Sequence, residues 1–137
     1  MKIDDTFLDN LTVLAKAKPR LRQSLDLRTT LEDNSQRMLN ALEPGTVIPI
    51  HRHRNTSETM VMVRGKLIER FYDDAGNLTD EFLMEPCGEY PMIQIPAGQW
   101  HSLEVLESGT IIFEAKDGKY LPLGEEDVII TKYNNNI

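Results

Sequence analysis

Short extended segments alternate with turn signals from residue 36 to residue 118, at intervals of about eight to twelve residues. The clearest turns are Glu43–Gly45, Asp73–Asn77 and Pro96–Gly98. The expected strands lie in residues 36–42, 46–53, 58–65, 66–72, 78–84, 92–106 (two short strands) and 109–118. Many short strands with close turns favour a β-sandwich or a β-barrel, so the chain is expected to be mainly all-β.

The N-terminal segment follows a different pattern, in which apolar residues recur at helical spacing. These residues are Phe7, Leu8, Leu11, Leu14 and Ala15. Asp5 or Thr6 can cap the start of the helix, and Pro19 ends it. We therefore expect residues 1–35 to form a helix and a connecting segment with one short strand, packed on a barrel of residues 36–130. Residues 131–137 are polar and are expected to fray.

Composition narrows the classes of function. The 137 residues fit one domain, and the net charge of −7 makes binding to nucleic acid unlikely because acidic surfaces repel phosphate backbones. No segment is apolar enough to predict a membrane span or a secretory signal. The single cysteine, Cys87, cannot form an intrachain disulfide, which predicts a cytoplasmic protein.

The three histidines of the chain fall at two strand–turn positions. Strand side chains alternate between faces, so His51 and His53 point the same way, and the following turn can bring Glu58 beside them. This group either binds a metal or is an exposed strand end that carries charge. His101 closes the turn Pro96–Gly98 and favours the metal-binding interpretation.

The spacing resembles that of the cupin superfamily. Gly45, His51, His53, Glu58 and Gly65 match the first cupin motif, and Pro96, Gly98 and His101 resemble the centre of the second. The sequence departs from the second motif at Tyr90, where a glycine is usual, and at Val105, where an asparagine is usual. The resemblance implies a double-stranded β-helix barrel of the jelly-roll type. It also implies that His51, His53, Glu58 and His101 bind one divalent metal ion.

A narrower resemblance is to the WbuC family of small cupin metalloproteins, through the segments 18–22, 36–53 and 96–127. It implies a role in bacterial polysaccharide metabolism, with a metal that polarises an oxygen of a sugar or sugar-nucleotide substrate. Zinc, iron, nickel, manganese and copper all suit such ligands. Two alternatives remain open: a non-catalytic module that binds a small molecule through the metal, and a metal-free sugar-nucleotide isomerase or epimerase that uses the histidines as acid and base.

Other residues are weaker candidates. Met60, Met62, Tyr90 and Glu114 are predicted to line a substrate pocket, and Trp100 is expected to pack on the face opposite His101. Arg20 and Arg22 could recognise a phosphate or carboxylate, although surface charge is their simpler role.

Two properties of the whole protein follow. Exposed barrel edges and the apolar stripe of the helix predict a homodimer. Histidine has an ordinary pKa of about 6.5, so metal-dependent stability is expected to fade towards pH 5.

Overall fold

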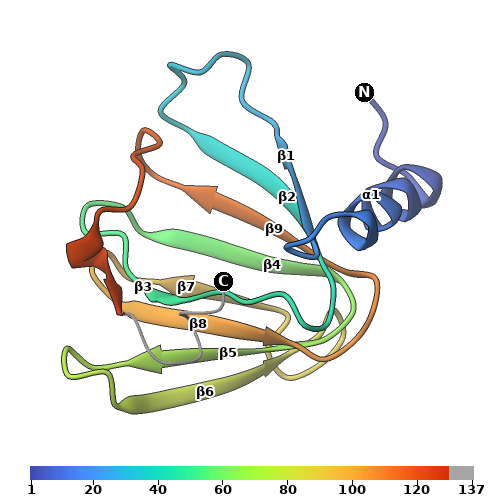
Figure 1. Ribbon diagram of the computed structural model, residues 1–137. Coiled ribbons are helices and arrows are strands. Elements are labelled where there is room, and N and C mark those ends of the chain that lie inside the picture. Colours follow the sequence, from blue (N-terminus) through green and yellow to red (C-terminus); the bar gives the residue numbers. More distant parts are fainter. Residues whose placement is uncertain (130–137) are drawn as a thin grey trace.

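Two five-stranded sheets, whose paired strands run antiparallel, face each other in the computed structural model, which describes residues 1–129 (Figure 1). The first sheet has the order β1 (Arg22–Asp26), β2 (Gln36–Leu42), β9 (Thr110–Lys116), β4 (Glu58–Arg64) and β7 (Met92–Ile95). The second has the order β10 (Val128–Ile129), β3 (Ile50–His51), β8 (Trp100–Val105), β5 (Leu67–Tyr72) and β6 (Leu78–Met84). The predicted all-β architecture is confirmed.

Most of the predicted strands form close to their expected bounds. The exception is residues 46–53, of which only Ile50 and His51 are in a strand. Pro49 has no backbone N–H to donate, which limits the ladder at that point. The sequence did not predict the 3₁₀ turn Glu125–Asp127 or β10, which pairs with β3. The tail 131–137 and residue 130 lie outside the described residues.

Helix α1 (Asp5–Ala17) packs on the outer side of the first sheet, at its β1–β2 end (Figure 1). Its N-cap is Asp4, whose carboxylate accepts a hydrogen bond from the backbone N–H of Phe7, so the predicted cap at Asp5 or Thr6 was wrong by one residue or more. Leu8, Leu11 and Ala15 are buried against β2 and β9, whereas Leu14 is half exposed. Strand β1 pairs with β2, so the segment before residue 36 belongs partly to the barrel.

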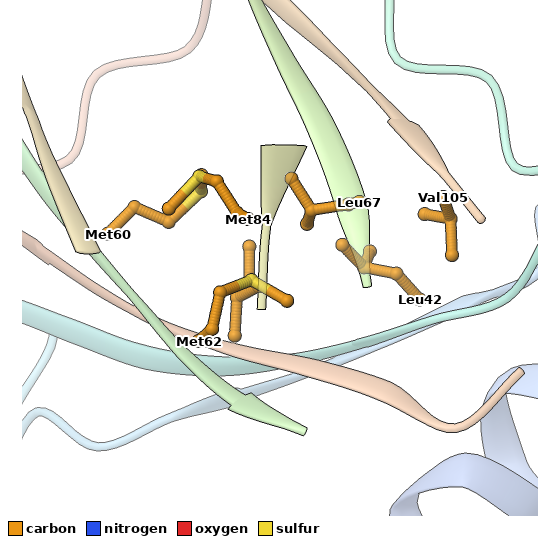
Figure 2. Close-up of a cluster of buried hydrophobic side chains, with 7 residues drawn as sticks. Leu42, Met60, Met62, Leu67, Met84 and Val105 are labelled. Carbon is orange, nitrogen blue, oxygen red and sulfur yellow. The ribbon is translucent and has the colours of Figure 1, made fainter. Parts of the chain in front are cut away.

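The space between the sheets is filled at one end by a hydrophobic cluster that contains two methionines of β4 (Figure 2). Its buried members are Leu42, Met60, Met62, Leu67, Met84, Val105 and Ile112. The other end of the same interior is polar, and it contains the histidines. Among the described residues, no helix is long and apolar enough to cross a membrane.

Candidate metal centre

The three histidines come from two neighbouring strands of the second sheet, β3 and β8, and from the residues that follow β3. His51 of β3 lies directly opposite His101 of β8 in the strand register, and His53 follows β3 by two residues. The backbone N–H of Gly98 donates to the carbonyl of His53 at 2.8 Å, which ties the loop after β3 to the turn before β8. As a result, one ring nitrogen from each histidine lies within 4.8 Å of the corresponding nitrogens of the other two.

Hydrogen bonds to the backbone fix the orientation of two imidazole rings. Nδ1 of His51 lies 2.8 Å from the carbonyl oxygen of Pro49, and Nδ1 of His101 lies 2.9 Å from that of Gln99. A carbonyl oxygen only accepts, so each Nδ1 carries the proton and donates it. This leaves Nε2 as the free ligand atom, which is the arrangement that metal-binding histidines usually show.

The histidines are neutral at physiological pH. Burial lowers the pKa of His51 to about 3, with a further contribution from the charge of His101. Burial likewise lowers the pKa of His53 to about 3, helped by the positive charge of Lys116, and burial also lowers the pKa of His101. A neutral ring with a protonated Nδ1 presents the lone pair of Nε2, which is the form that binds a metal.

Glu58 faces these nitrogens from the opposite sheet. Its Oε2 lies 3.5 Å from Nε2 of His101 and 4.0 Å from Nε2 of His53, and the atom is buried without a hydrogen-bond partner. The Nε2 lone pair of His101 and the carboxylate oxygen are both acceptors, so they repel unless a cation or a proton lies between them. An orphaned buried carboxylate oxygen opposite neutral imidazoles fits a divalent metal ion.

Two further carboxyl groups lie in the same interior. Glu114 of β9 has a pKa raised to about 8, first by burial and then by the charge of Glu58. Glu69 of β5 is fully buried, both of its carboxylate oxygens lack a hydrogen-bond partner, and burial raises its pKa well above the usual value. Glu114 therefore holds a proton near neutral pH when no metal is bound, and burial disfavours the ionised form of Glu69 in the same way.

These groups line a cavity of about 190 Å³, which we call the inner cavity. Its polar lining consists of Arg22, Asn40, His51, His53, Glu58, Glu69, His101, Glu114 and Lys116. Sequence patterns did not single out Glu69, although Leu67 and Glu69 lie two residues apart in β5 and so share one face. An apolar Leu67 on the same face was the available sequence signal, and its burial in the structure shows that this face points inward.

The predicted pocket residues divide into two groups. Met60 and Glu114 line the inner cavity, together with the four predicted metal ligands. Met62 instead lies in the hydrophobic cluster, and Tyr90 packs edge-on against Phe82, with ring centroids 5.4 Å apart. Neither residue is among those that line the cavity.

Arg22 lines the inner cavity, whereas Trp100 does not. Trp100 is buried outside the cavity, its indole N–H donates to Asp74 at 3.0 Å, and the guanidinium of Arg52 lies 4.5 Å from the ring centroid. Arg22 lines the inner cavity and donates to the carbonyl of Val47 at 3.1 Å. Burial, followed by the charge of Arg20, lowers its pKa. Arg22 is therefore part of the site, whereas Trp100 supports the strand that carries His101.

Comparison with known proteins identifies relatives of the chain and of its fold. A family model described as "Domain of unknown function (DUF6016)" matches residues 3–84, which is more than half of the chain. No curated protein matches the sequence.

Solved structures share the fold at low sequence identity. The capsular polysaccharide assembling protein CapF from Staphylococcus aureus superimposes with a TM-score of 0.66 at 21% identity, and the match covers 82% of this chain and 32% of CapF. KdgF from Halomonas sp. has a TM-score of 0.60 at 13% identity, with 76% and 85% covered. The oxalate decarboxylase of Bacillus subtilis, which has Mn(II) centres, has a TM-score of 0.54 at 22% identity, with 74% and 26% covered.

These neighbours are cupins, and the agreement establishes the cupin fold for this chain. The chain spans about a third of CapF and about a quarter of the decarboxylase, so the activities of those longer proteins belong to them. The narrower resemblance to the WbuC family stays a prediction.

Proposed function

Because the chain belongs to the DUF6016 family, whose description assigns no activity, we propose a function from the site itself: a metal-dependent cupin that acts on a small sugar or sugar-nucleotide-like molecule. The observation that carries the proposal is the pair of facing acceptors, Nε2 of His101 and the buried Oε2 of Glu58, 3.5 Å apart. The proposed ligands are His51, His53, Glu58 and His101.

A bound divalent ion would act as a Lewis acid that polarises a carbonyl or hydroxyl oxygen of the substrate. The chain supplies the remaining chemistry. Pro49 and Gln99 hold the rings of His51 and His101 through their carbonyls. Burial raises the pKa values of Glu69 and Glu114, which line the same cavity, and a protonated carboxyl group there would donate a proton to a substrate oxygen. Isomerisation, epimerisation and oxidation are the reactions that this set could support.

The metal-free alternative, in which histidines act as acid and base, is less well supported. An efficient general base has a pKa near the working pH, whereas burial lowers the pKa of His51 and of His53 to about 3. Those rings would bind protons too weakly at neutral pH to serve as bases. A non-catalytic binding module uses the same ligands, and turnover of a panel of sugars and sugar nucleotides separates it from an enzyme.

The sugar-related part of the proposal is supported by analogy with CapF, which is a capsular polysaccharide assembling protein. Cytoplasmic residence is also proposed, because Cys87 is exposed and is the sole cysteine of the chain. Neither statement depends on which metal is bound.

Metal analysis of purified, metal-supplemented protein tests the proposal. Wild type should hold about one equivalent of a divalent ion, and His53→Ala and Glu58→Gln should each lose most of it. Gln94→Ala is the matched control, since Gln94 is exposed on β7 and pairs with Thr59 rather than with the site. Less than about a tenth of an equivalent in wild type would contradict the assignment.

A further inference from the structure

A second cavity of about 690 Å³ adjoins the inner cavity, and we call it the outer cavity. His53, Arg22 and Lys116 line both of them, so the outer cavity begins at the proposed metal site. A third cavity, of about 440 Å³, also includes Arg20 and Arg22 in its lining. Arg22 therefore lines all three cavities.

The lining of the outer cavity is strongly basic. Six of its residues are cationic, and they are Arg20, Arg22, Arg52, Arg54, Lys116 and Lys119. Only two are acidic, Glu126 and Asp127, so the lining carries a formal charge of +4 from six cations less two anions. The whole chain carries a formal charge of −7. The outer cavity is therefore a region of concentrated positive charge on an otherwise acidic protein.

Internal ion pairs neutralise only part of this charge. Arg52 and Arg54 share one carboxylate oxygen of Asp127, at 3.0 and 2.6 Å. Lys116 lies 4.0 Å from a carboxyl oxygen of Glu114, which holds a proton near neutral pH. Within residues 1–129, no ion pair involves Arg20, Arg22 or Lys119.

Arg22 is the best placed of these unpaired cations. It is partly buried, and the neighbouring charge of Arg20 disfavours its own charge. One of its terminal nitrogens donates to the carbonyl of Val47 at 3.1 Å, which orients the guanidinium. Its remaining N–H groups form a planar fork that matches the oxygens of a phosphate or a carboxylate. Arg20 is exposed, so the cost of an unpaired charge falls on the half-buried Arg22, and an oxyanion beside it would offset that cost.

We propose that the outer cavity binds an oxyanionic group of the ligand, with Arg22 as its principal anchor and Arg20, Lys116 and Lys119 as further cations. The inference rests on the proposed function, because it assigns the substrate class of the same site. The substrate is then an anionic sugar derivative whose charged group lies in the outer cavity while a neutral oxygen reaches the inner one. A phosphorylated sugar and a sugar acid are the two sources of such an oxyanion.

Calorimetric titration of metal-supplemented, full-length protein tests this inference with three matched probes: glucose 1-phosphate, glucuronate and glucose. At least one anionic probe should bind roughly tenfold or more tightly than glucose, as expected of charge-assisted hydrogen bonds. A preference for glucose 1-phosphate identifies a phosphorylated sugar, and a preference for glucuronate identifies a sugar acid. Equal affinity for all three probes, or no binding of either anion, would overturn the proposal.

Substitutions in the outer cavity test which residues bind the anionic probe. Arg22→Gln should weaken the preferred anionic probe roughly tenfold, and Arg22→Lys should recover part of the loss because it keeps the charge without the fork. Lys119→Gln should weaken binding of the same probe by a smaller factor. It also tests the proposal if Arg22→Gln folds poorly, since the Lys119 side chain makes no hydrogen bond among the described residues. Arg70→Gln is the matched control, because Arg70 pairs with Glu81 and Glu104 and lines none of the three cavities. If all four variants behaved alike, the outer cavity would not be the anion site.

Metal content is measured on the same samples, so the two proposals can fail separately. Protein without metal that still prefers an anionic probe contradicts the proposed metal chemistry and leaves the outer cavity as an anion site. Protein that holds metal but does not discriminate anionic from neutral probes contradicts the outer cavity alone.

Discussion

Lowering the pH from 7.5 to 5 should leave the difference in stability between metal-loaded and metal-stripped protein almost unchanged. If the histidines had ordinary pKa values of about 6.5, protons at pH 5 would weaken binding at each of them about 30-fold. The structure instead lowers the pKa of His51 and His53 to about 3 before any ion is present. Their Nε2 lone pairs are therefore free at pH 5, so we expect the metal-dependent stability to persist where ordinary histidine pKa values would make it fade.

The two expectations differ by a measurable amount. A metal at a hundred times its dissociation constant stabilises the fold by about 2.7 kcal/mol, which raises the melting temperature of a domain of this size by roughly 10 °C. Three ordinary histidines would lose about 6 kcal/mol of metal binding between pH 7.5 and pH 5, and the difference between loaded and stripped protein would disappear. With pKa values near 3 for His51 and His53, most of the difference should remain.

The absolute stability still changes with pH. The unfolded chain takes up a proton on His51 below about pH 6.5, whereas the folded protein does so only near its lowered pKa of about 3. The stability that His51 contributes is therefore complete above pH 6.5 and is lost as pH falls, by about 2 kcal/mol at pH 5. Loaded and stripped protein lose it together, so their melting curves shift in parallel.

Calorimetric melting of metal-loaded and metal-stripped protein at pH 7.5 and pH 5 is the assay, with Glu114→Gln as a companion variant. Glu114 is included because it lines the inner cavity and its pKa of about 8 means that it still holds a proton at pH 7.5. A difference that vanishes at pH 5 in both wild type and Glu114→Gln would refute the reasoning. A difference that vanishes only in wild type would identify Glu114 as the competing proton carrier.

Three further predictions concern the fold and the assembly. In metal-free protein, Glu69→Gln should gain stability over wild type in urea titrations as pH rises from 5 to 8. Burial raises the pKa of Glu69, so the stability that it contributes is complete below about pH 4.5 and is lost at higher pH; a constant offset between the two proteins would contradict this. Gly98→Ala should lower the free energy of unfolding by about 1–2 kcal/mol, because Gly98 has a φ of +83° but no atom lies within 4 Å of the new Cβ. Gly65→Ala should lower it clearly more, because Gly65 has a φ of +84° and the new Cβ would lie 2.6 Å from Cα of Thr110. Equal losses for the two variants would contradict the steric argument. Light scattering at micromolar concentration should give about twice 15.7 kDa for the predicted homodimer, whereas a monomer mass at every dilution would exclude it.

The strand pattern and the histidine positions were predictable because each depends on local rules. Alternation and turn residues gave the bounds of β2, β4, β5 and β6, and the two-residue spacing put His51 and His53 on one face. The register between strands is a non-local property, and spacing alone did not predict that His51 lies opposite His101. That pairing needs the return of the chain through β4 to β7, which only the family resemblance supplied.

The sequence could not predict how far along the barrel each inward-facing side chain lies. Met60 and Met62 share a face of β4, yet only Met60 reaches the inner cavity, because Met62 lies one step further towards the hydrophobic end. Glu69 was missed for a different reason: glutamate in a strand is ordinarily exposed, since burying a carboxyl group without a partner is costly. Such an exception is visible only when the opposing strands are placed around it.

Net charge was the least informative property, because it sums over groups that the fold separates. The acidic side chains Glu58, Glu69 and Glu114 line the inner cavity, Arg22 lines both cavities, and Lys119 lines only the outer one of the two. Ionised carboxylates at the inner end would repel an anionic ligand, whereas protonated or metal-compensated ones would not. Thermodynamic linkage then makes the two proposed sites interdependent: a cation held by the histidines favours an anion beside Arg22, and the anion favours the cation by the same factor.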